Sequence, residues 1–530
     1  MRRNSTPWPM LCAIGVLACL SLTVPSGAAP THDDPKIHDE QNPYEGPGHR
    51  GAALSPDQTG RILDTFPASG VELLGWVPLG ELPGGSTRAN DITGYVSPSG
   101  REYAVIGLAK GTGFVEVTDP LDPQVVGVIP GEESIWRDMK THGEFAFAVH
   151  DLPRHGEQTG NGIQVIDLRQ IDAGQVQLIR EVNDLGLITS HNIALDPASG
   201  TAYLAGSNYG GPPLSNGGLI AVDLSDPENP TFDGTTIWDE TYVHDVLVTT
   251  YQSGPYAGRE IAFAAAGPAG LIIIDVTDKS NMTTLGQLVY PNTAYCHHAW
   301  LSDDKSLLYV NDELDELNDP DVATTTTYTV DVSDLENPTY LGSFTNGLPA
   351  IDHNPMGRDG YLYEANYRSG LRIWDVREPG EETEVAWFDS YPDDDAASFN
   401  GAWGVYTGLP SGTILVSDIE RGLFVLRATV IGVAETAAET RILLRGAPNP
   451  FRGATTLRFS LRAEEPVLLD LHTPSGRRVA RLLDGTLGPG DHVVPVNLDR
   501  LPAGPAASGV LFARLRIGTR ITTERLVLVE

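Results

Sequence analysis

The feature that most constrains the fold is a phrase that recurs seven times along the chain: an apolar run opened by Gly, often closed by Asp, then a polar turn. The copies are Gly113–Asp119, Gly162–Asp167, Gly218–Asp223, Gly270–Asp275, Tyr328–Asp331, Gly370–Asp375 and Gly422–Leu426. Several are followed by a proline turn such as Asp226–Pro230. Proline fixes φ and lacks an N–H, so these segments leave the ladder and reverse. Repeated units of short antiparallel strands are therefore expected.

A second phrase precedes each copy of the first by about 20 to 30 residues. It begins at Asn90, Arg137, His191, His244, His297, His353 and Asn400, with spacings of 47, 54, 53, 53, 56 and 47. Periods near 50 residues with about four strands each are typical of propeller blades. Because one blade cannot bury both of its faces, blades stack into a ring. The spacing predicts a seven-bladed β-propeller over residues 70–430.

The two ends of this repeat region are complementary. The last copy, Gly422–Leu426, has no strand after it, whereas an unpaired strand of that type, Val71–Val77, precedes the first repeat. Pairing the two would complete the last blade and remove an exposed strand edge. We therefore expect Val71–Val77 to pair with Gly422–Leu426.

The N-terminus has the pattern of a signal peptide over residues 1–29. Arg2 and Arg3 precede an apolar core at 10–24 and a small-residue stretch at 26–29. That core is short for a membrane span, and no later apolar run reaches about 20 residues. The sequence predicts a secreted or cell-surface protein without a transmembrane segment after signal removal. Residues 30–69 show little periodicity and are expected to be largely irregular.

Beyond the repeats, residues 431–445 are predicted to be a linker, and residues 446–530 an Ig-like β-sandwich of alternating strands. The expected fold class is all-β: a seven-bladed propeller followed by this small sandwich. Residues 446–530 carry a net charge of +3 and residues 1–445 of −38, within a total of −35. A surface this acidic repels phosphate, which argues against nucleic-acid partners.

The repeat region resembles the LVIVD β-propeller repeat and, over about 70–430, bacterial surface proteins of the choice-of-anchor B family. The matching segments are Tyr242–Asp245, Gly258–Phe263, Asn311–Glu316, Ala350–His353, Asn366–Arg372, Phe399–Trp403 and Ser417–Phe424. The resemblance implies one propeller combined with different C-terminal anchoring signals, and no established catalytic chemistry.

The tail resembles the Ig-like module used as a type IX secretion sorting domain, which is similar to the flagellar hook-capping module. Its matches are Pro448–Phe451, Ser475–Arg477, Gly490–His492 and Ser508–Val510. The resemblance implies that residues 446–530 engage secretion or anchoring machinery.

Four consecutive repeats place histidine at one position: His191, His244, His297 and His353. Because the second phrase is expected to form the innermost strand, these imidazoles would recur around the axis and could bind zinc, copper or iron. In three repeats an aspartate comes directly after this position, and its carboxylate is a candidate to orient an imidazole ring: Asp91, Asp138 and Asp245. Alternatively, each imidazole bonds the backbone of a neighbouring strand.

An acidic loop at Asn311–Asp321 holds six carboxylates in the ten residues from Asp312 to Asp321. Hard oxygen donors suit Ca²⁺, and Asp312, Glu313, Asp315 and Glu316 are the candidate ligands. The alternative is a solvated acidic loop. The loop lacks the glycine and glutamate spacing of an EF-hand.

Phosphate-cradling loops, zinc-finger cysteine sets and nucleophile-elbow motifs are absent from the sequence. The leading interpretation is a binding or scaffold module for an unidentified extracellular ligand. The alternative is a metal-dependent extracellular enzyme, hydrolytic or oxidative, that uses the axial histidines.

Overall fold

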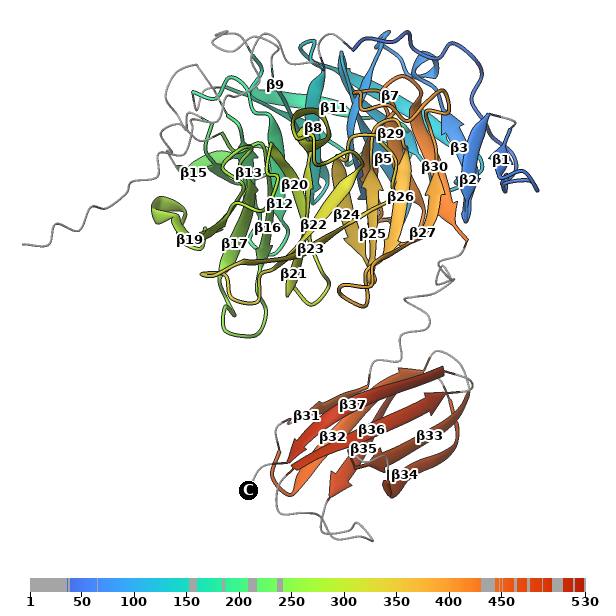
Figure 1. Ribbon diagram of the computed structural model, residues 1–530, viewed down its shortest axis with the longest axis vertical. Coiled ribbons are helices and arrows are strands. Elements are labelled where there is room, and N and C mark those ends of the chain that lie inside the picture. Colours follow the sequence, from blue (N-terminus) through green and yellow to red (C-terminus); the bar gives the residue numbers. More distant parts are fainter. Residues whose placement is uncertain are drawn as a thin grey trace, which may run out of the picture. The chain divides into compact units, whose positions relative to one another are not determined.

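The computed structural model describes residues 36, 39–63, 65–151, 160–183, 186–207, 217–235, 242–429, 444–447, 449, 451–461, 465–473, 477–488, 490–497, 509–517 and 520–528. The chain divides into two compact units, residues 1–430 and 431–530 (Figure 1). Within the described residues the regular structure is almost entirely β, and α2 (Asp315–Asn318) is a single helical turn. The all-β prediction is confirmed.

The first unit is built from antiparallel sheets of consecutive strands. The first two are β4 (Ala89–Val96), β5 (Glu102–Leu108), β6 (Gly111–Glu116) and β7 (Gln124–Pro130), then β8 (Trp136–His142), β9 (Phe145–Asp151), β10 (Ile163–Asp167) and β11 (Gln177–Val182). The next two are β12 (Asn192–Asp196), β13 (Thr201–Ala205), β14 (Ile220–Asp223) and β15 (Thr231–Thr235), then β16 (Asp245–Thr250), β17 (Glu260–Ala265), β18 (Leu271–Asp275) and β19 (Thr283–Leu288).

The remaining sheets of this unit follow the same order. They are β20 (Cys296–Leu301), β21 (Leu307–Asp312), β22 (Thr326–Asp331) and β23 (Thr339–Thr345); β24 (Asn354–Arg358), β25 (Tyr361–Ala365), β26 (Leu371–Asp375) and β27 (Thr383–Phe388); and β28 (Ala402–Tyr406), β29 (Ile414–Asp418) and β30 (Gly422–Ala428) with β3 (Val71–Val77). In every sheet the Gly-to-Asp phrase forms the third strand.

The first strands of successive sheets contact one another. These contacts run β4–β8, β8–β12, β12–β16, β16–β20, β20–β24, β24–β28 and back from β28 to β4. Between sheets, apolar side chains interdigitate: Phe263 and Ile273 of one sheet share a fully buried core with Leu308 of the next. Four-stranded sheets stacked face to face around a common centre are the architecture of a repeat β-propeller.

The strand that precedes the repeats completes the last sheet. β3 pairs antiparallel with β30, with Leu73 opposite Leu426 and Val77 opposite Leu423. Trp76 stacks on Phe424 at a ring-centroid distance of 5.3 Å, and its indole N–H donates to the Arg421 carbonyl at 2.8 Å. The predicted pairing of Val71–Val77 with Gly422–Leu426 is confirmed.

Residues 30–69 are not wholly irregular. β1 (Arg61–Ile62) and β2 (Phe66–Ser69) pair with each other, and Ala68 of β2 lies opposite Phe388 of β27, so that β2 extends that sheet. The prediction of a largely irregular segment did not identify these two strands, because strands of two and four residues are too short to show a period of two. Phe66 carries the buried contacts, with ring centroids 5.3 Å from Trp76 and 5.4 Å from Phe388.

The second unit contains two antiparallel sheets. One has the order β31 (Arg445–Ala447), β32 (Ala454–Leu461) and β35 (Gly490–Asn497); the other has β34 (Arg478–Leu487), β33 (Glu465–His472), β36 (Gly509–Ile517) and β37 (Arg520–Leu528). Leu457, Leu469 and Leu515 are fully buried in one core shared by the two sheets. In the part of the chain that the structure describes, no helix is long and apolar enough to span a bilayer.

Candidate cation site at the centre of the ring

The four repeated histidines come together where the first strands begin. His191, His244 and His353 directly precede β12, β16 and β24, and His297 is the second residue of β20. None is more than 5% exposed. Successive ring centroids are 4.2, 4.1 and 4.3 Å apart from His191 to His353, with neighbouring ring planes tilted by 55°, 41° and 39°. These four tilted imidazoles form one contiguous group, the histidine stack.

Hydrogen bonds determine which nitrogen of each ring carries the proton. Nδ1 of His353 lies 2.7 Å from the Trp403 carbonyl oxygen, and Nδ1 of His244 lies 3.2 Å from the His297 carbonyl oxygen. Nδ1 of His191 lies 3.2 Å from Oδ2 of Asp151. Carbonyl and carboxylate oxygens accept, so each of these Nδ1 atoms carries a hydrogen, and Nε2 of a ring that is neutral keeps its lone pair. Metal-binding imidazoles are held in this way.

Three of the four rings, those of His244, His297 and His353, are held neutral. Burial lowers the pKa of His244, His297 and His353 well below 6.5, and neighbouring imidazoles and the Lys36 ammonium lower it further. The hypothesis that these histidines bond neighbouring backbone holds for His244 and His353. It does not account for His297, whose Nδ1 has no hydrogen-bond partner among the described residues.

Glu313 of the acidic loop joins this stack. Its Oε1 accepts from the Tyr367 hydroxyl at 2.6 Å and lies 3.6 Å from Nε2 of His353, and its Oε2 lies 3.6 Å from Nε2 of His297. One ligand atom each from His244, His297 and Glu313 lies within 4.8 Å of the other two. The sequence placed Glu313 in a calcium loop, whereas the structure turns its carboxylate toward the imidazoles.

Lys36 brings a positive charge to the same place. Its Nζ is 2.6 Å from Oε1 of Glu313 and lies over the rings of Trp403 and Phe399, at 5.5 and 5.8 Å from their centroids. The residue is 5% exposed. Sequence reasoning missed Lys36, because it precedes the repeats in a stretch without periodicity. The acceptors gathered here, a carboxylate and imidazole lone pairs, all favour a cation.

Asp91, Asp138 and Asp245 do not orient the rings as expected. Asp138 accepts from the Ile193 amide at 2.9 Å and from Lys140 at 2.5 Å, and Lys140 lies 3.6 Å from Asp91. Asp245 lies 3.8 Å from His298. Asp151 and two backbone carbonyls orient the rings instead. Asp151 ends β9, and no local signal connects it to His191.

A cavity of about 520 Å³ is lined by all the first strands. Its wall is mostly apolar, with Ile193, Val246 and Met356 among the lining residues, while Lys140, Asp245 and His298 supply polar groups. An apolar pocket with a few polar groups is typical of a small-molecule site.

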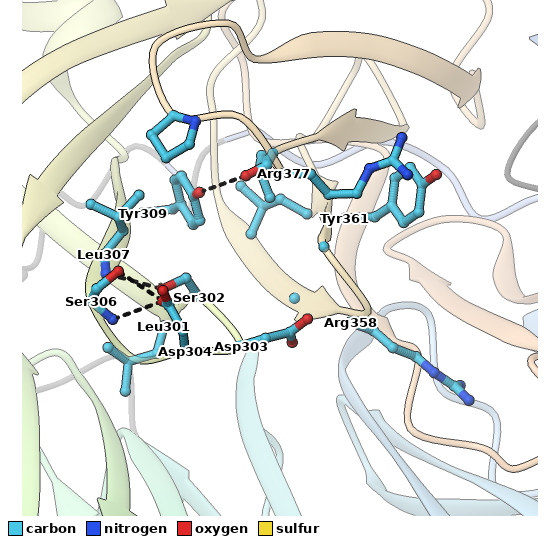
Figure 2. Close-up of a pocket in the computed structure, with 15 residues that line it drawn as sticks. Leu301, Ser302, Asp303, Asp304, Ser306, Leu307, Tyr309, Arg358, Tyr361 and Arg377 are labelled. Carbon is cyan, nitrogen blue, oxygen red and sulfur yellow. Dashed lines mark hydrogen bonds between the residues drawn. The ribbon is translucent and has the colours of Figure 1, made fainter. Parts of the chain in front are cut away.

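A second pocket, of about 230 Å³, lies between the turn after β20 and the turns around β25 and β26 (Figure 2). Three of its four charged groups, Asp304, Arg358 and Arg377, are engaged locally. Asp304 accepts from the hydroxyls of Ser302 and Ser306 at 2.8 and 2.7 Å, and the Arg377 guanidinium donates to Asp375 at 2.8 Å. These contacts stabilise turns, so this pocket has few groups left for a ligand.

The other acidic-loop residues divide between two places. Asp312 accepts from the Tyr290 hydroxyl at 2.7 Å and from the amides of Ala294 and Tyr295 at 3.0 and 2.5 Å, which ties β21 to the preceding loop. Asp315 and Glu316 instead approach Asp352. The four candidate calcium ligands therefore do not form one site.

Comparison with known proteins gives one family match: the LVIVD repeat model matches residues 214–236 and 260–288. A crystal structure of a protein from Lactobacillus plantarum is similar to this chain with 13% identity and a TM-score of 0.40, covering 78% of this chain and all of that one. No curated protein matches. The chain thus contains LVIVD repeats, in the sheets β12–β15 and β16–β19, in keeping with a repeat β-propeller.

Proposed function

We propose that the protein is an extracellular binding and scaffold module, a closed seven-bladed β-propeller whose central site binds a transition-metal ion. The observation that carries this proposal is the convergence of His244, His297 and Glu313, with Nδ1 of His244 already hydrogen-bonded to a backbone carbonyl. The seven-bladed count is supported by the unbroken cycle of contacts between first strands, from β4 round to β28 and back.

Electrostatics favours a cation at this place. A carboxylate and imidazole lone pairs that face one another at 3.6 Å repel unless positive charge lies among them. In the structure the Lys36 ammonium provides that charge. Imidazole and carboxylate donors together suit zinc, copper or iron, and the two-histidine, one-glutamate set is one that zinc uses. We propose that Zn²⁺ competes with Lys36 for Glu313.

The test is metal content and affinity. The chain from residue 30 is stripped of metal, loaded with Zn²⁺, dialysed and analysed by elemental mass spectrometry and calorimetry. We expect one Zn²⁺ per chain, and at least a tenfold loss of affinity in His297→Ala and Glu313→Gln. His142→Ala, at the far end of β8, is the matched control and keeps wild-type affinity. Failure of the wild type to retain Zn²⁺, or equal binding by Glu313→Gln, would overturn the assignment.

We also propose that residues 1–29 direct export, that 431–445 are a linker, and that 446–530 form an Ig-like module that engages secretion or anchoring machinery. Support comes from the choice-of-anchor B and type IX resemblances and from the separate compact unit with its own core. Deleting 446–530 in the native host is expected to abolish surface retention or release. Unchanged localisation of the truncated chain would contradict this role.

A metal-dependent extracellular enzyme is the second candidate function. Three protein ligands leave a coordination position for water or substrate, as in catalytic zinc sites. Hydrolysis of ester and peptide panels, or oxidation of phenolic substrates, by metal-loaded protein is the test. Turnover that requires the metal and disappears in Glu313→Gln would establish an enzyme. Metal binding without turnover would favour the first proposal, a binding module, over the enzyme.

A further inference from the structure

A second group of acceptors lies between two neighbouring sheets, apart from the histidine stack. The short helix α2 follows β21 and carries Asp315 and Glu316, while Asp352 stands two residues before β24 of the next sheet. One carboxylate oxygen from each of the three lies within 4.8 Å of the other two. Asp315 and Asp352 are fully buried.

In each of the two aspartates, one carboxylate oxygen accepts a side-chain hydrogen bond and the other has no hydrogen-bond partner among the described residues. Oδ2 of Asp315 accepts from the Tyr328 hydroxyl at 2.7 Å, and Oδ2 of Asp352 accepts from the Asn311 amide at 2.8 Å. Their Oδ1 atoms, and both carboxylate oxygens of Glu316, are buried without a hydrogen-bond partner among the described residues. Unpaired buried acceptors are uncommon in folded proteins and call for an explanation.

The cluster also has no positive counter-charge. No lysine or arginine of the described chain forms an ion pair with Asp315, Glu316 or Asp352, in contrast to Glu313, which Lys36 pairs. Burial raises the pKa values of Asp352 and Glu316 well above the usual values for these groups, and the negative charge of the neighbouring carboxylates raises them further. Three such groups close together can all be ionised only if a cation joins them.

We propose that Asp315, Glu316 and Asp352 bind one Ca²⁺ that links two adjacent sheets of the ring. The donors are hard oxygens, with no imidazole or thiolate to favour a transition metal. Ca²⁺–oxygen distances of about 2.3–2.6 Å place opposite ligands about 4.6–5.2 Å apart, which suits oxygens that lie within 4.8 Å of one another.

This site differs from the loop site expected from the sequence. Asp312 and Glu313 are excluded, because the first is saturated by Tyr290 and two amides and the second faces the histidines. Asp352, about 40 residues further along the chain, replaces them. The cation would hold α2 of one sheet against the loop before β24, and would thereby steady the backbone that presents Glu313.

The experiment is a calcium titration of the chain from residue 30 after treatment with EGTA. At 100 times its Kd, a ligand of the native state alone raises Tm of a ring this size by about 3 °C. We expect this shift for the wild type and for Asp321→Asn, an exposed carboxylate of the same loop that serves as the matched control. Asp352→Asn is expected to lose at least tenfold in Ca²⁺ affinity by calorimetry.

The variant also distinguishes a lost ligand from a damaged fold. Asparagine keeps an oxygen to accept from Asn311 and removes one charge from the cluster, so Tm without calcium should equal or exceed that of the wild type. The histidine site is separable, because His297→Ala should retain the full calcium response. Absence of a Tm shift and of Ca²⁺ binding heat in the wild type would overturn the proposal, as would undiminished Ca²⁺ affinity in Asp352→Asn.

Discussion

Closure of the ring through β3 and β30 can be tested by a cross-link between two residues far apart in sequence. Glu72 lies directly opposite Arg427 in the strand register, and the Arg427 guanidinium donates to Glu72 at 2.9 Å. Directly opposed residues of antiparallel strands have Cβ atoms about 4.5–5.5 Å apart, so Glu72→Cys with Arg427→Cys should form a disulfide after a small local adjustment. Loss of this partly exposed ion pair costs less than about 1 kcal/mol.

The expected gain in thermal stability depends on the length of chain between the two cysteines, which are 355 positions apart. Loop-closure entropy for about 355 residues amounts to about 20 cal/mol/K, or about 6 kcal/mol at 25 °C. With an unfolding entropy of about 0.8 kcal/mol/K for a unit of about 390 residues, this predicts a rise in Tm of about 7 °C. Thermal unfolding followed by circular dichroism, with and without reductant, measures it.

Controls are available in these strands and at Arg421, which directly precedes β30. Each single cysteine variant, and the mismatched pair Glu72→Cys with Arg421→Cys, should show no reductant-dependent Tm. Cys296 is fully buried, and burial raises the pKa of its thiol to about 12, so it should not exchange. If the matched pair stays reduced under oxidising conditions, or forms without a gain in Tm, the closure reasoning is refuted.

Three further predictions concern the same unit. Trp76→Ala should lower the stability of the ring by about 4 kcal/mol, because it empties a packed aromatic site, and Trp76→Phe should cost clearly less; a denaturation difference below about 1 kcal/mol for the alanine variant would contradict this. Burial, and then the charge of Arg137, lowers the pKa of His150 to about 4, so between pH 6.5 and about 4 the unfolded chain binds a proton that the folded chain does not. The free energy of unfolding should therefore be unaffected above pH 6.5 and should fall by up to about 3 kcal/mol as the pH drops from 6.5 to about 4. In acid denaturation, His150→Gln should flatten this pH dependence. Removal of residues 431–530 should leave the calorimetric transition of the first unit within about 1 °C, and its loss would show that the two units depend on each other.

The repeat spacing predicted much of the candidate site. Equivalent positions of successive sheets lie at the same level of a ring. His191, His244, His297 and His353 could therefore be expected to meet, and their rings do lie in contact. The period could not identify Glu313, Lys36 or Asp151, because each comes from a segment outside the repeated phrase. Nor could it show which carboxylates of the acidic loop act together.

What the sequence alone determined is therefore the periodic part of this protein. It comprises the all-β class, the recurrence of one strand phrase in every repeat, and the pairing of Val71–Val77 with the last strand. These depend on local chemistry, since glycine, proline and alternating apolar residues set strand and turn wherever they occur. Only the tertiary structure separated Glu313 from Asp315, two residues away, and joined Asp315 to Asp352. The direction of a side chain at the end of a strand depends on the backbone turn and on partners from other sheets, such as Tyr367 and Tyr328, and neither is encoded in the spacing of the loop itself.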